Sequence, residues 1–406
     1  MLLHSRLLPL ALLCLIVTLS AGQQPTDETL LDKRRTIQKP SEREVLEEEY
    51  TIMSDLLKEI KSRTILSSTV QNRSSSTSTR LQDSLALRKL FAVTRQNGQW
   101  TIPWNLQDPI DTWHGITLNS NGNVIMIELP DNNLKGPLPS EIGMISQLEF
   151  LNLNVNQLHS SLPNELFDLT QLKVLLLFNN AFSGTLSKKI GQLASLEVIS
   201  LSLNLFGGKI PVEIANCQEL YSLHLQHNNF ISKVPESLYS LSNLNALFLQ
   251  DNSLTGKISP LVGNLINLKF LRYADNSISG KLPTSIGNLT QLEQFHVNNN
   301  FLSGPLPVEI KFLTSLHSLF LRNNYFSGSL PPEFSSLTNL VVLEASNNFF
   351  SGCLPYEYGN MPNLHKIFFD NNNLSGTFPP EYINFCGKAP NFAQNPSLSF
   401  LSLIHI

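Results

Sequence analysis

A repeat of 24 residues orders the hydrophobic and polar positions along most of the chain. Each unit follows the pattern LxxLxxLxLxxNxLxGxLPxxIGxL, in which leucine or another apolar residue returns at fixed places. Such self-similarity predicts a solenoid with one structural unit per repeat. The asparagine of the pattern recurs without insertion at eleven positions: Asn132, Asn156, Asn180, Asn204, Asn228, Asn252, Asn276, Asn300, Asn324, Asn348 and Asn372.

Each repeat is predicted to contain one short strand followed by a turn. In the repeat around Asn324, Leu319 and Leu321 turn inward and Phe320 outward, and the same strand recurs 24 residues later to pair in parallel. The asparagine stands where the chain leaves the strand, so its amide can satisfy the backbone groups of neighbouring turns. We therefore expect a parallel sheet with an asparagine ladder beside it.

Glycine and proline shape the second half of each repeat. Glycine stands four residues after the asparagine in nine repeats, and Ser160 and Ser232 take its place in the other two. Proline stands three residues further on, again in nine repeats. Because these residues form a tight return path and stop a continuous helix, the face opposite the sheet is predicted to consist of 3₁₀ turns and short extended pieces.

This pattern resembles the plant-type leucine-rich repeats of receptor-like proteins, receptor kinases and polygalacturonase inhibitors. The resemblance covers residues 122–385, which would be eleven repeats. It implies an α/β-class leucine-rich-repeat solenoid that is curved, with the parallel sheet on the concave face and irregular or 3₁₀ segments on the convex face. It also implies a binding protein rather than an enzyme.

The residues before the repeats resemble the amino-terminal cap of this family. Over residues 81–121 the resemblance implies a helix followed by a tryptophan-bearing strand. The paired cysteines of the family cap are absent, since Thr112 and Leu118 stand near their expected places. Packing alone must therefore close this end of the solenoid. The apolar residues expected to do so are Leu85, Leu87, Leu90, Phe91, Trp100, Trp104 and Trp113.

The residues after the repeats, 386–406, look like the remnant of a carboxy-terminal cap. The sequence NFAQNPSL resembles the loop that closes such arrays. The cysteine that usually follows is missing, because Ser399 and Phe400 stand there instead. This cap is therefore incomplete or divergent.

Two further segments precede the amino-terminal cap. Residues 1–22 are predicted to be a signal peptide, because Arg6 precedes an apolar run that is too short to span a bilayer as a helix. Residues 23–80 are predicted to be a charged amphipathic helix and a Ser/Thr-rich linker, with a short coiled coil or disorder as alternatives for the helix. Spacings of four and three residues indicate the helix, at Leu46, Tyr50, Met53, Leu57 and Ile60.

Composition argues against several classes of function. A net charge of −4 gives no basic surface for nucleic acid or acidic membranes. Three cysteines would remain after signal cleavage, too few for a disulfide framework. Cys217 replaces a core leucine, and the pairing of Cys353 with Cys386 stays open. No later stretch reaches the roughly eighteen apolar residues of a spanning helix.

The strand residues four and two positions before each ladder asparagine are expected to point out from the concave face. Aromatic and arginine side chains gather here in successive coils, which is the composition of binding hot spots. Arg272 and Arg322 lie two coils apart, about 10 Å, where both would engage a peptide's terminal carboxylate or neighbouring acidic groups. Surface residues without a specific role are the alternative. The predicted ligand-binding strip consists of His224, Gln226, Phe248, Gln250, Arg272, His296, Asn298, Phe320 and Arg322.

Catalytic and metal chemistry find little support in the sequence. Asp251 and Asp275 lie one coil apart, about 5 Å, which suits a retaining glycosidase, but both are expected in a solvated turn. His224 and His296 lie three coils apart, about 14 Å, which is too far to share a zinc ion. The glycines are explained by the repeat, and no nucleophile elbow is visible. We therefore predict no catalytic residue, no metal and no cofactor.

The sequence favours an extracellular recognition protein, secreted or at the cell surface, that binds a peptide, a protein or a cell-wall glycan. The resemblance leaves open a truncated receptor-kinase ectodomain, a secreted inhibitor and a matrix adhesion protein. A structural surface protein and a carbohydrate-active enzyme are the alternatives from another class. On an exported chain, the sequons at Asn72, Asn288 and Asn373 predict N-linked glycans, whereas Pro396 blocks Asn395.

Overall fold

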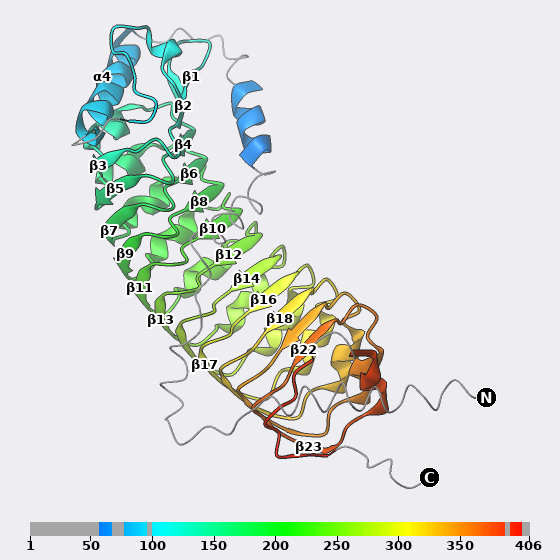
Figure 1. Cartoon of the computed structure of the whole chain (residues 1–406). Coiled ribbons are helices and arrows are strands. Elements are labelled where there is room, and N and C mark those ends of the chain that lie inside the picture. The colour runs from blue at the N-terminus through cyan, green and yellow to red at the C-terminus, as the bar shows by residue number, and fades with distance from the viewer. Residues whose placement is uncertain (1–56, 67–76, 96–99, 386–389, 400–406) are drawn as a thin grey trace. The chain divides into compact units, whose positions relative to one another are not determined.

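The computed structural model describes residues 57–66, 77–95, 100–385 and 390–399 (Figure 1). The expected signal peptide, the residues from 67 to 76 of the linker and the last residues of the chain lie outside these ranges. The described residues form two compact units, one ending at Ile231 and the other beginning at Ser232. We call residues 57–231 the amino-terminal unit and residues 232–399 the carboxy-terminal unit.

The amino-terminal unit begins with helical segments. Residues 57–66 are helical and contain Leu57 and Ile60, the last two apolar positions of the predicted amphipathic helix, whose earlier part lies outside the described residues. Helix α4 (Thr77–Thr94) begins inside the stretch that was expected to be linker and buries Leu87, Leu90 and Phe91. Leu85 was expected to cover the first coil, and this is wrong, because its side chain is exposed on the outer side of the helix.

The tryptophans of the cap do not lie in a strand, contrary to expectation. Trp100, Trp104 and Trp113 lie in the irregular segment between α4 and strand β1 (Ile116–Leu118), which contains the short 3₁₀ helix η2 (Ile110–Thr112). Their buried rings pack in a chain, with centroids 4.8 Å apart for Trp100 and Trp104 and 4.9 Å for Trp104 and Trp113. Ring-to-ring packing and indole hydrogen bonds to backbone carbonyls hold this segment without strand pairing.

Two sheets run through the amino-terminal unit, as the repeat predicts. The first sheet has β1 antiparallel to β2 and parallel pairing thereafter: β2 (Val124–Glu128), β4 (Phe150–Asn152), β6 (Val174–Leu176), β8 (Val198–Ser200) and β10 (Ser222–His224). The second contains β3 (Lys135–Pro137), β5 (Gln157–Ser160), β7 (Ala181–Thr185), β9 (Leu205–Gly208) and β11 (Asn229–Ser232). Along the chain, a 3₁₀ turn follows each strand of the second sheet and precedes the next strand of the first sheet. These turns are η3 (Ser140–Met144), η4 (Asn164–Asp168), η5 (Lys188–Gln192) and η6 (Val212–Asn216).

The carboxy-terminal unit repeats the same arrangement. Its first sheet contains β12 (Ala246–Phe248), β14 (Phe270–Arg272), β16 (Gln294–His296), β18 (Ser318–Phe320), β20 (Val342–Glu344) and β22 (Lys366–Phe368), all parallel. Its second contains β13 (Ser253–Gly256), β15 (Ser277–Gly280), β17 (Phe301–Gly304), β19 (Tyr325–Gly328), β21 (Phe349–Gly352), β23 (Asn373–Thr377) and β24 (Ser397–Ser399). The 3₁₀ turns are η7 (Glu236–Ser240), η8 (Pro260–Asn264), η9 (Thr284–Asn288), η10 (Val308–Phe312), η11 (Pro332–Ser336), η12 (Tyr356–Asn360) and η13 (Pro380–Phe385).

The expected architecture, a parallel sheet with 3₁₀ turns on the other face, is thus confirmed. The leucine-rich side chains of each coil point inward and together form a continuous core. Leu151, Leu175 and Ile199, in the middle of successive strands, are fully buried there. The side chains on either side of these positions point away from the core. We call that side the outer face of the first sheet.

The asparagine ladder is confirmed. In the amino-terminal unit, the Asn204 amide nitrogen donates to the carbonyls of Leu177, Leu201 and Ser202 at 3.0–3.1 Å, and its oxygen accepts the backbone N–H of Phe182 at 2.9 Å. The ladder continues beyond the repeats to Asn395, whose amide donates to three backbone carbonyls. Backbone groups that the strands leave unpaired are thereby satisfied from coil to coil.

Ser160 is held in a conformation that favours glycine. Its φ is +71°, whereas the glycine at the equivalent place in the next repeat, Gly184, has φ +82°. An L-residue there carries a steric cost that glycine avoids. We predict that Ser160→Gly raises the free energy of unfolding by roughly 0.5–1 kcal/mol, since relief of strain exceeds the added chain entropy.

Urea denaturation of the Ser160→Gly variant measures this effect. The control is Ser183→Gly in the extended strand β7, where glycine only adds chain entropy and should lower stability by about 0.5–1 kcal/mol. The same sign of change in both variants would contradict the assignment of strain to Ser160.

Both cysteines in the described part of the chain, Cys217 and Cys353, are free thiols. Cys217 is buried as predicted, donates to the carbonyl oxygen of Ile190 at 3.3 Å, and has its pKa raised to about 11 by burial. It is therefore an unreactive core residue. Cys353 is an exposed free thiol, and its possible partner Cys386 lies outside the described residues. Of the helices in the described part of the chain, none is long and apolar enough to cross a membrane.

Candidate functional site

Strand register brings much of the predicted ligand-binding strip into one row on the carboxy-terminal unit. Phe248 pairs in register with Arg272, Arg272 with His296, and His296 with Phe320. The row continues through Glu344 to Phe368. Gln250, Asn298 and Arg322 follow two residues after their strands and form a second row beside the first. His224 and Gln226 belong to the amino-terminal unit, at the end of β10 and just beyond it.

Four residues of the strip are buried, which corrects the expectation that they are exposed. His224 and Gln226 are almost fully buried, and Phe248 and Arg272 are only 1% and 7% exposed to solvent. The His224 Nε2 lies 2.6 Å from the hydroxyl of Ser222. The Arg272 guanidinium lies over the Phe248 ring, 4.8 Å from its centroid, and Nη2 donates to the Gln294 side chain. The contacts named here join side chains of the same strand or of neighbouring strands, and the repeat pattern does not specify them.

His296 and Phe320 form the partly exposed aromatic centre of the row. Their rings stack in parallel, with centroids 4.2 Å apart and an angle of 9° between the planes. The His296 Nε2 lies 2.8 Å from the Ser318 hydroxyl. Burial, together with the nearby Arg272 charge, holds the pKa of His296 well below its usual range, so the ring is neutral at physiological pH. This part of the row therefore offers a flat, uncharged surface.

Arg322 is the more accessible of the two strip arginines. Its Nη1 lies 3.3 Å from the carboxylate of Glu344, and its side chain is 36% exposed to solvent. Burial raises the pKa of Glu344, while the Arg322 charge acts in the opposite direction. The expected pairing of Arg272 and Arg322 on one carboxylate does not fit, because Arg272 is buried against Phe248 and Gln294. Of the two strip arginines, Arg322 is the one placed to meet an anionic group.

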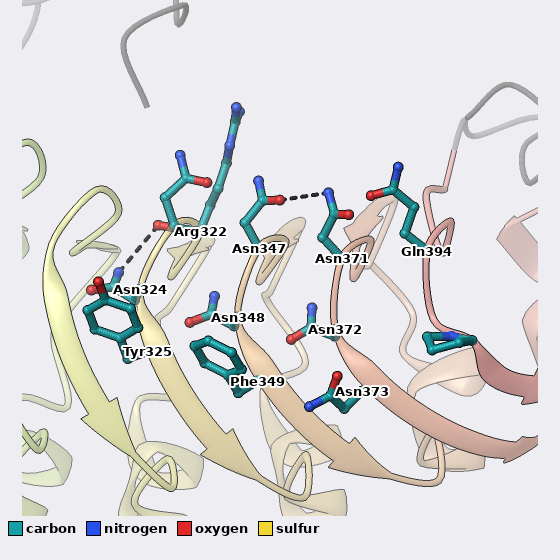
Figure 2. A pocket seen from close by; sticks show the side chains of 12 residues that line it. Arg322, Asn324, Tyr325, Asn347, Asn348, Phe349, Asn371, Asn372, Asn373 and Gln394 are labelled. Atoms are coloured by element: carbon teal, nitrogen blue, oxygen red, sulfur yellow. Dashed lines mark hydrogen bonds between the residues drawn. The ribbon is translucent and has the colours of Figure 1, made fainter. Parts of the chain in front are cut away.

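A pocket of about 370 Å³ opens beside Arg322, next to the carboxyl ends of the last strands of the first sheet. Figure 2 shows Asn347, Asn371 and Gln394 on one side of the ladder asparagines and Tyr325 and Phe349 on the other. The Asn371 amide donates to the Asn347 side chain at 2.7 Å. The pocket is lined by Arg322, Asn323, Asn324, Tyr325, Asn347, Asn348, Phe349, Asn371, Asn372, Asn373, Gln394 and Pro396. Amide groups, two aromatic rings and one guanidinium therefore surround it.

An aromatic stripe borders this pocket, and the sequence reasoning missed it. Phe301, Tyr325 and Phe349 stack in successive coils, with ring centroids 6.1 and 6.0 Å apart. The rings of Tyr325 and Phe349 are exposed. The signal was available, because an aromatic residue directly follows the ladder asparagine in three consecutive repeats. The predicted strip is confined to the strand positions before the asparagine, whereas this stripe directly follows it.

The carboxylates considered for catalysis lie in turns with positive φ, 52° for Asp251 and 54° for Asp275. Asp275 is exposed and accepts the Asn299 amide at 2.7 Å. A solvated carboxylate of this kind lacks the dry surroundings that create a general acid. Among the described residues, no three His, Cys, Asp or Glu side chains gather as a metal site requires.

Two of the three predicted glycosylation sites lie among the described residues. Asn288 ends η9 and Asn373 begins β23, and both side chains are exposed. Asn72 lies outside the described residues. Asn395 is buried in the ladder, which gives a structural reason, besides Pro396, against modification.

Sequence comparison finds the Leucine Rich Repeat family in two parts of the chain, residues 267–289 and 315–337. A probable leucine-rich repeat receptor-like protein kinase of Arabidopsis thaliana is 47% identical over 51 residues. This match covers 12% of the chain and 5% of the kinase. The similarity is therefore local.

Structure comparison finds ectodomains of plant receptors. The ectodomain of the receptor kinase GASSHO1/SCHENGEN3 from Arabidopsis thaliana, solved with CASPARIAN STRIP INTEGRITY FACTOR 2, is 29% identical with a TM-score of 0.70, covering 78% of this chain and 38% of that one. The plant peptide hormone receptor RGFR1, solved with RGF2, is 31% identical with a TM-score of 0.66, covering 69% and 45%. The chain thus spans less than half the length of either receptor structure.

Proposed function

Because the chain belongs to the leucine-rich-repeat family in its plant form and resembles receptor-kinase ectodomains, we propose that it is an extracellular recognition protein that binds a peptide. The binding surface is the row around His296 and Phe320 together with Arg322 and the adjoining pocket. The two receptors described above were solved with RGF2 and CASPARIAN STRIP INTEGRITY FACTOR 2, and RGFR1 is a peptide hormone receptor. A cell-surface receptor piece and a secreted binder both fit this function.

The chemistry of the surface suits an extended peptide. The stacked His296 and Phe320 rings offer an apolar platform, and the pocket amides are donors and acceptors for a peptide backbone. The Arg322 guanidinium is suited to a carboxylate, which it binds with charge-assisted hydrogen bonds. The observation that carries the proposal is that Arg322 lies two residues after Phe320 of the aromatic platform and also lines the pocket. One peptide can therefore use both.

Calorimetric titration with synthetic peptides tests the proposal. Protein from a glycosylating host would be titrated with peptides that end in a free carboxylate and with the same peptides as terminal amides. We expect Phe320→Ala and Arg322→Ala each to weaken binding about tenfold or more, as truncation of a hot spot does. Amidation should remove the effect of Arg322→Ala, because both changes delete one contact. The intact mass of this protein also checks for glycans at Asn288 and Asn373.

The matched control is Lys281→Ala, which removes one positive charge from an exposed residue just after β15. Phe248 and Arg272 are unsuitable test positions, since both are buried and their truncation would also disturb packing. Affinity that falls with Lys281→Ala but not with Phe320→Ala or Arg322→Ala would contradict the proposed surface. A peptide panel without any binder would count against a peptide ligand.

A cell-wall glycan is the second candidate ligand, and the aromatic stripe favours it. Exposed aromatic rings such as Tyr325 and Phe349 provide apolar area for sugar rings, and asparagine amides beside them can bind hydroxyl groups. Titration with oligosaccharides distinguishes the two. A glycan on the stripe should bind more weakly to Tyr325→Ala and equally well to Phe320→Ala, whereas a peptide on the row should show sensitivity to Phe320→Ala.

A further inference from the structure

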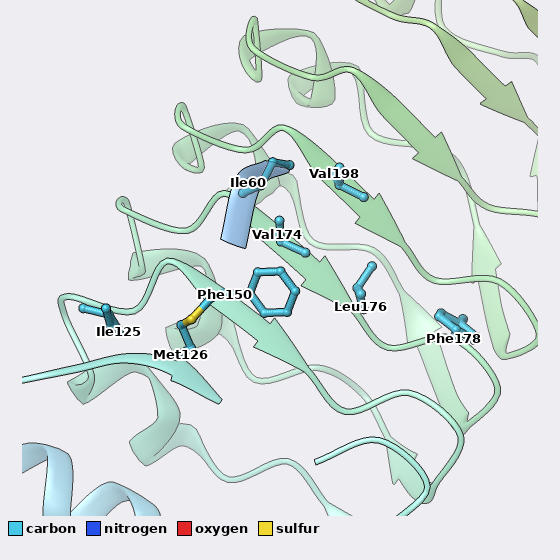
Figure 3. Packing of buried hydrophobic residues seen from close by; sticks show 8 residues of the cluster. All are labelled: Ile60, Ile125, Met126, Phe150, Val174, Leu176, Phe178 and Val198. Carbon is cyan, nitrogen blue, oxygen red and sulfur yellow. The ribbon is translucent and has the colours of Figure 1, made fainter. Parts of the chain in front are cut away.

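The helical segment of residues 57–66 lies on the outer face of the first sheet in the amino-terminal unit (Figures 1 and 3). Ile60 points from this segment into the sheet and is 0% exposed. Figure 3 shows it beside Val174 of β6 and Val198 of β8, with Leu176 further along β6 and Phe150 on the neighbouring strand β4. Leu57, one turn earlier, packs against the same cluster. The segment is thus a helix docked through its apolar stripe.

The sheet beneath Ile60 carries a row of apolar side chains. Met126, Phe150, Val174 and Val198 pair in register on the four adjacent strands β2, β4, β6 and β8. All four are buried, although they point away from the core of the solenoid. Four adjacent apolar side chains on a solvent-facing sheet would form an exposed patch without a cover. The docked segment supplies that cover.

The corresponding row of the carboxy-terminal unit is mixed in character. It reads Ala246, Phe270, Gln294, Ser318, Val342 and Lys366. The repeat itself therefore does not require apolar residues at this position. The unbroken row in the amino-terminal unit is a local specialisation of its outer face, and it coincides with the docked helix.

Charged side chains frame the apolar contact. Lys61 pairs with Glu128 at the end of β2, and its ammonium group also lies 5.1 Å from the centroid of the Phe150 ring. Arg63 donates to Glu197 at 2.7 Å, although the two residues are 134 positions apart in the sequence. Two basic groups on one helix thus meet two acidic groups on the sheet. The contact fixes both the position and the direction of the helix.

The described helix of ten residues depends on this contact for its order. Isolated helices shorter than about 12–15 residues are marginal in water, so most of their stability in a protein comes from packing of an apolar face. Ile60, which is fully buried, supplies the centre of that face. A change at Ile60 is therefore expected to release the segment while the repeats, which have their own core, remain folded.

We propose that the outer face formed by Met126, Phe150, Val174, Val198, Glu128 and Glu197 is a binding site for a basic amphipathic helix, and that residues 57–66 occupy it in cis. The segment acts as an intramolecular ligand that keeps this face closed to other helices. The site lies in a different unit from the proposed peptide surface and takes a different ligand. This proposal can therefore be tested independently of the proposed function.

Displacement by a labelled copy of the segment tests this site on the full chain. The probe is a fluorescent synthetic peptide of residues 57–66, and its binding is followed by anisotropy. We expect the Ile60→Asp chain, whose own helix is released, to bind the probe at least about tenfold more tightly than the wild-type chain. Adding Val174→Asp on the sheet should abolish this gain, because the apolar row is then interrupted.

Ser62→Ala provides the matched control in the chain, since Ser62 lies on the exposed side of the same helix. This variant should bind the probe as weakly as the wild type does. A probe that itself carries Ile60→Asp should not bind any of the chains. Unchanged melting temperature of the repeats in the Ile60→Asp chain shows that only the helix is released. Equal probe binding to the wild-type and Ile60→Asp chains, or none to either, would overturn the proposal.

Discussion

Replacing Asn300 by alanine is expected to lower the free energy of unfolding by about 3–5 kcal/mol, because several buried backbone groups lose a partner together. Asn300 is buried in the ladder of the carboxy-terminal unit. Its oxygen accepts the backbone N–H of Ile278 at 2.9 Å, and its nitrogen donates to the carbonyls of Tyr273, Val297 and Asn298 at 2.9–3.2 Å. Alanine leaves the Ile278 N–H without its acceptor and takes one donor from each carbonyl.

Urea denaturation followed by circular dichroism measures the effect of Asn300→Ala. The control is Asn298→Ala, two residues earlier, where the side chain lies on the partly exposed outer face. That change should cost less than about 0.5 kcal/mol, as is usual for surface positions. If both substitutions destabilise the protein equally, the ladder is not the source of the stability assigned to it.

Replacing Trp104 by alanine is expected to lower the free energy of unfolding by about 3–5 kcal/mol, the usual range for removal of a buried tryptophan. Trp104 is central to the cap, since it packs on Trp100, on Trp113 and, with ring centroids 6.0 Å apart, on Phe91. Its indole N–H also donates to the carbonyl of His114 at 2.9 Å. The sequence lacks the cap cysteines of the family, so this packing closes the amino-terminal end of the repeats.

Thermal unfolding and size-exclusion chromatography check the Trp104→Ala variant. We expect a lower melting temperature and some self-association, because a loosened cap exposes the apolar end of the first coil and a strand edge. Ile102→Ala, in the same segment but exposed, should leave both measurements close to those of the wild type. A Trp104→Ala protein that is monomeric and melts like the Ile102→Ala protein would show that the cap does not depend on this ring.

The periodic part of the sequence was enough to predict the solenoid, its parallel sheet, its 3₁₀ turns and its asparagine ladder. The reason is that each coil contacts mainly its neighbours, so a pattern repeated every 24 residues specifies the same contacts in every coil. The pattern failed where the period ends. The final ladder member, Asn395, follows Asn372 by 23 residues rather than 24, so a step of constant length misses it.

Only the tertiary structure decided which of the outer residues are accessible and what covers the sheet. Phe248 was expected to be an exposed anchor, yet the Arg272 guanidinium lies on its ring and the side chain is buried. The docking of residues 57–66 depends on contacts such as Arg63 with Glu197, which join a segment before the repeats to the repeats themselves and which the common period does not specify. The repeat pattern therefore determines each coil and its contacts with neighbouring coils. The solvent exposure of a side chain on the outer face also depends on which distant segments pack over it. Such packing between distant segments exists only in the folded chain.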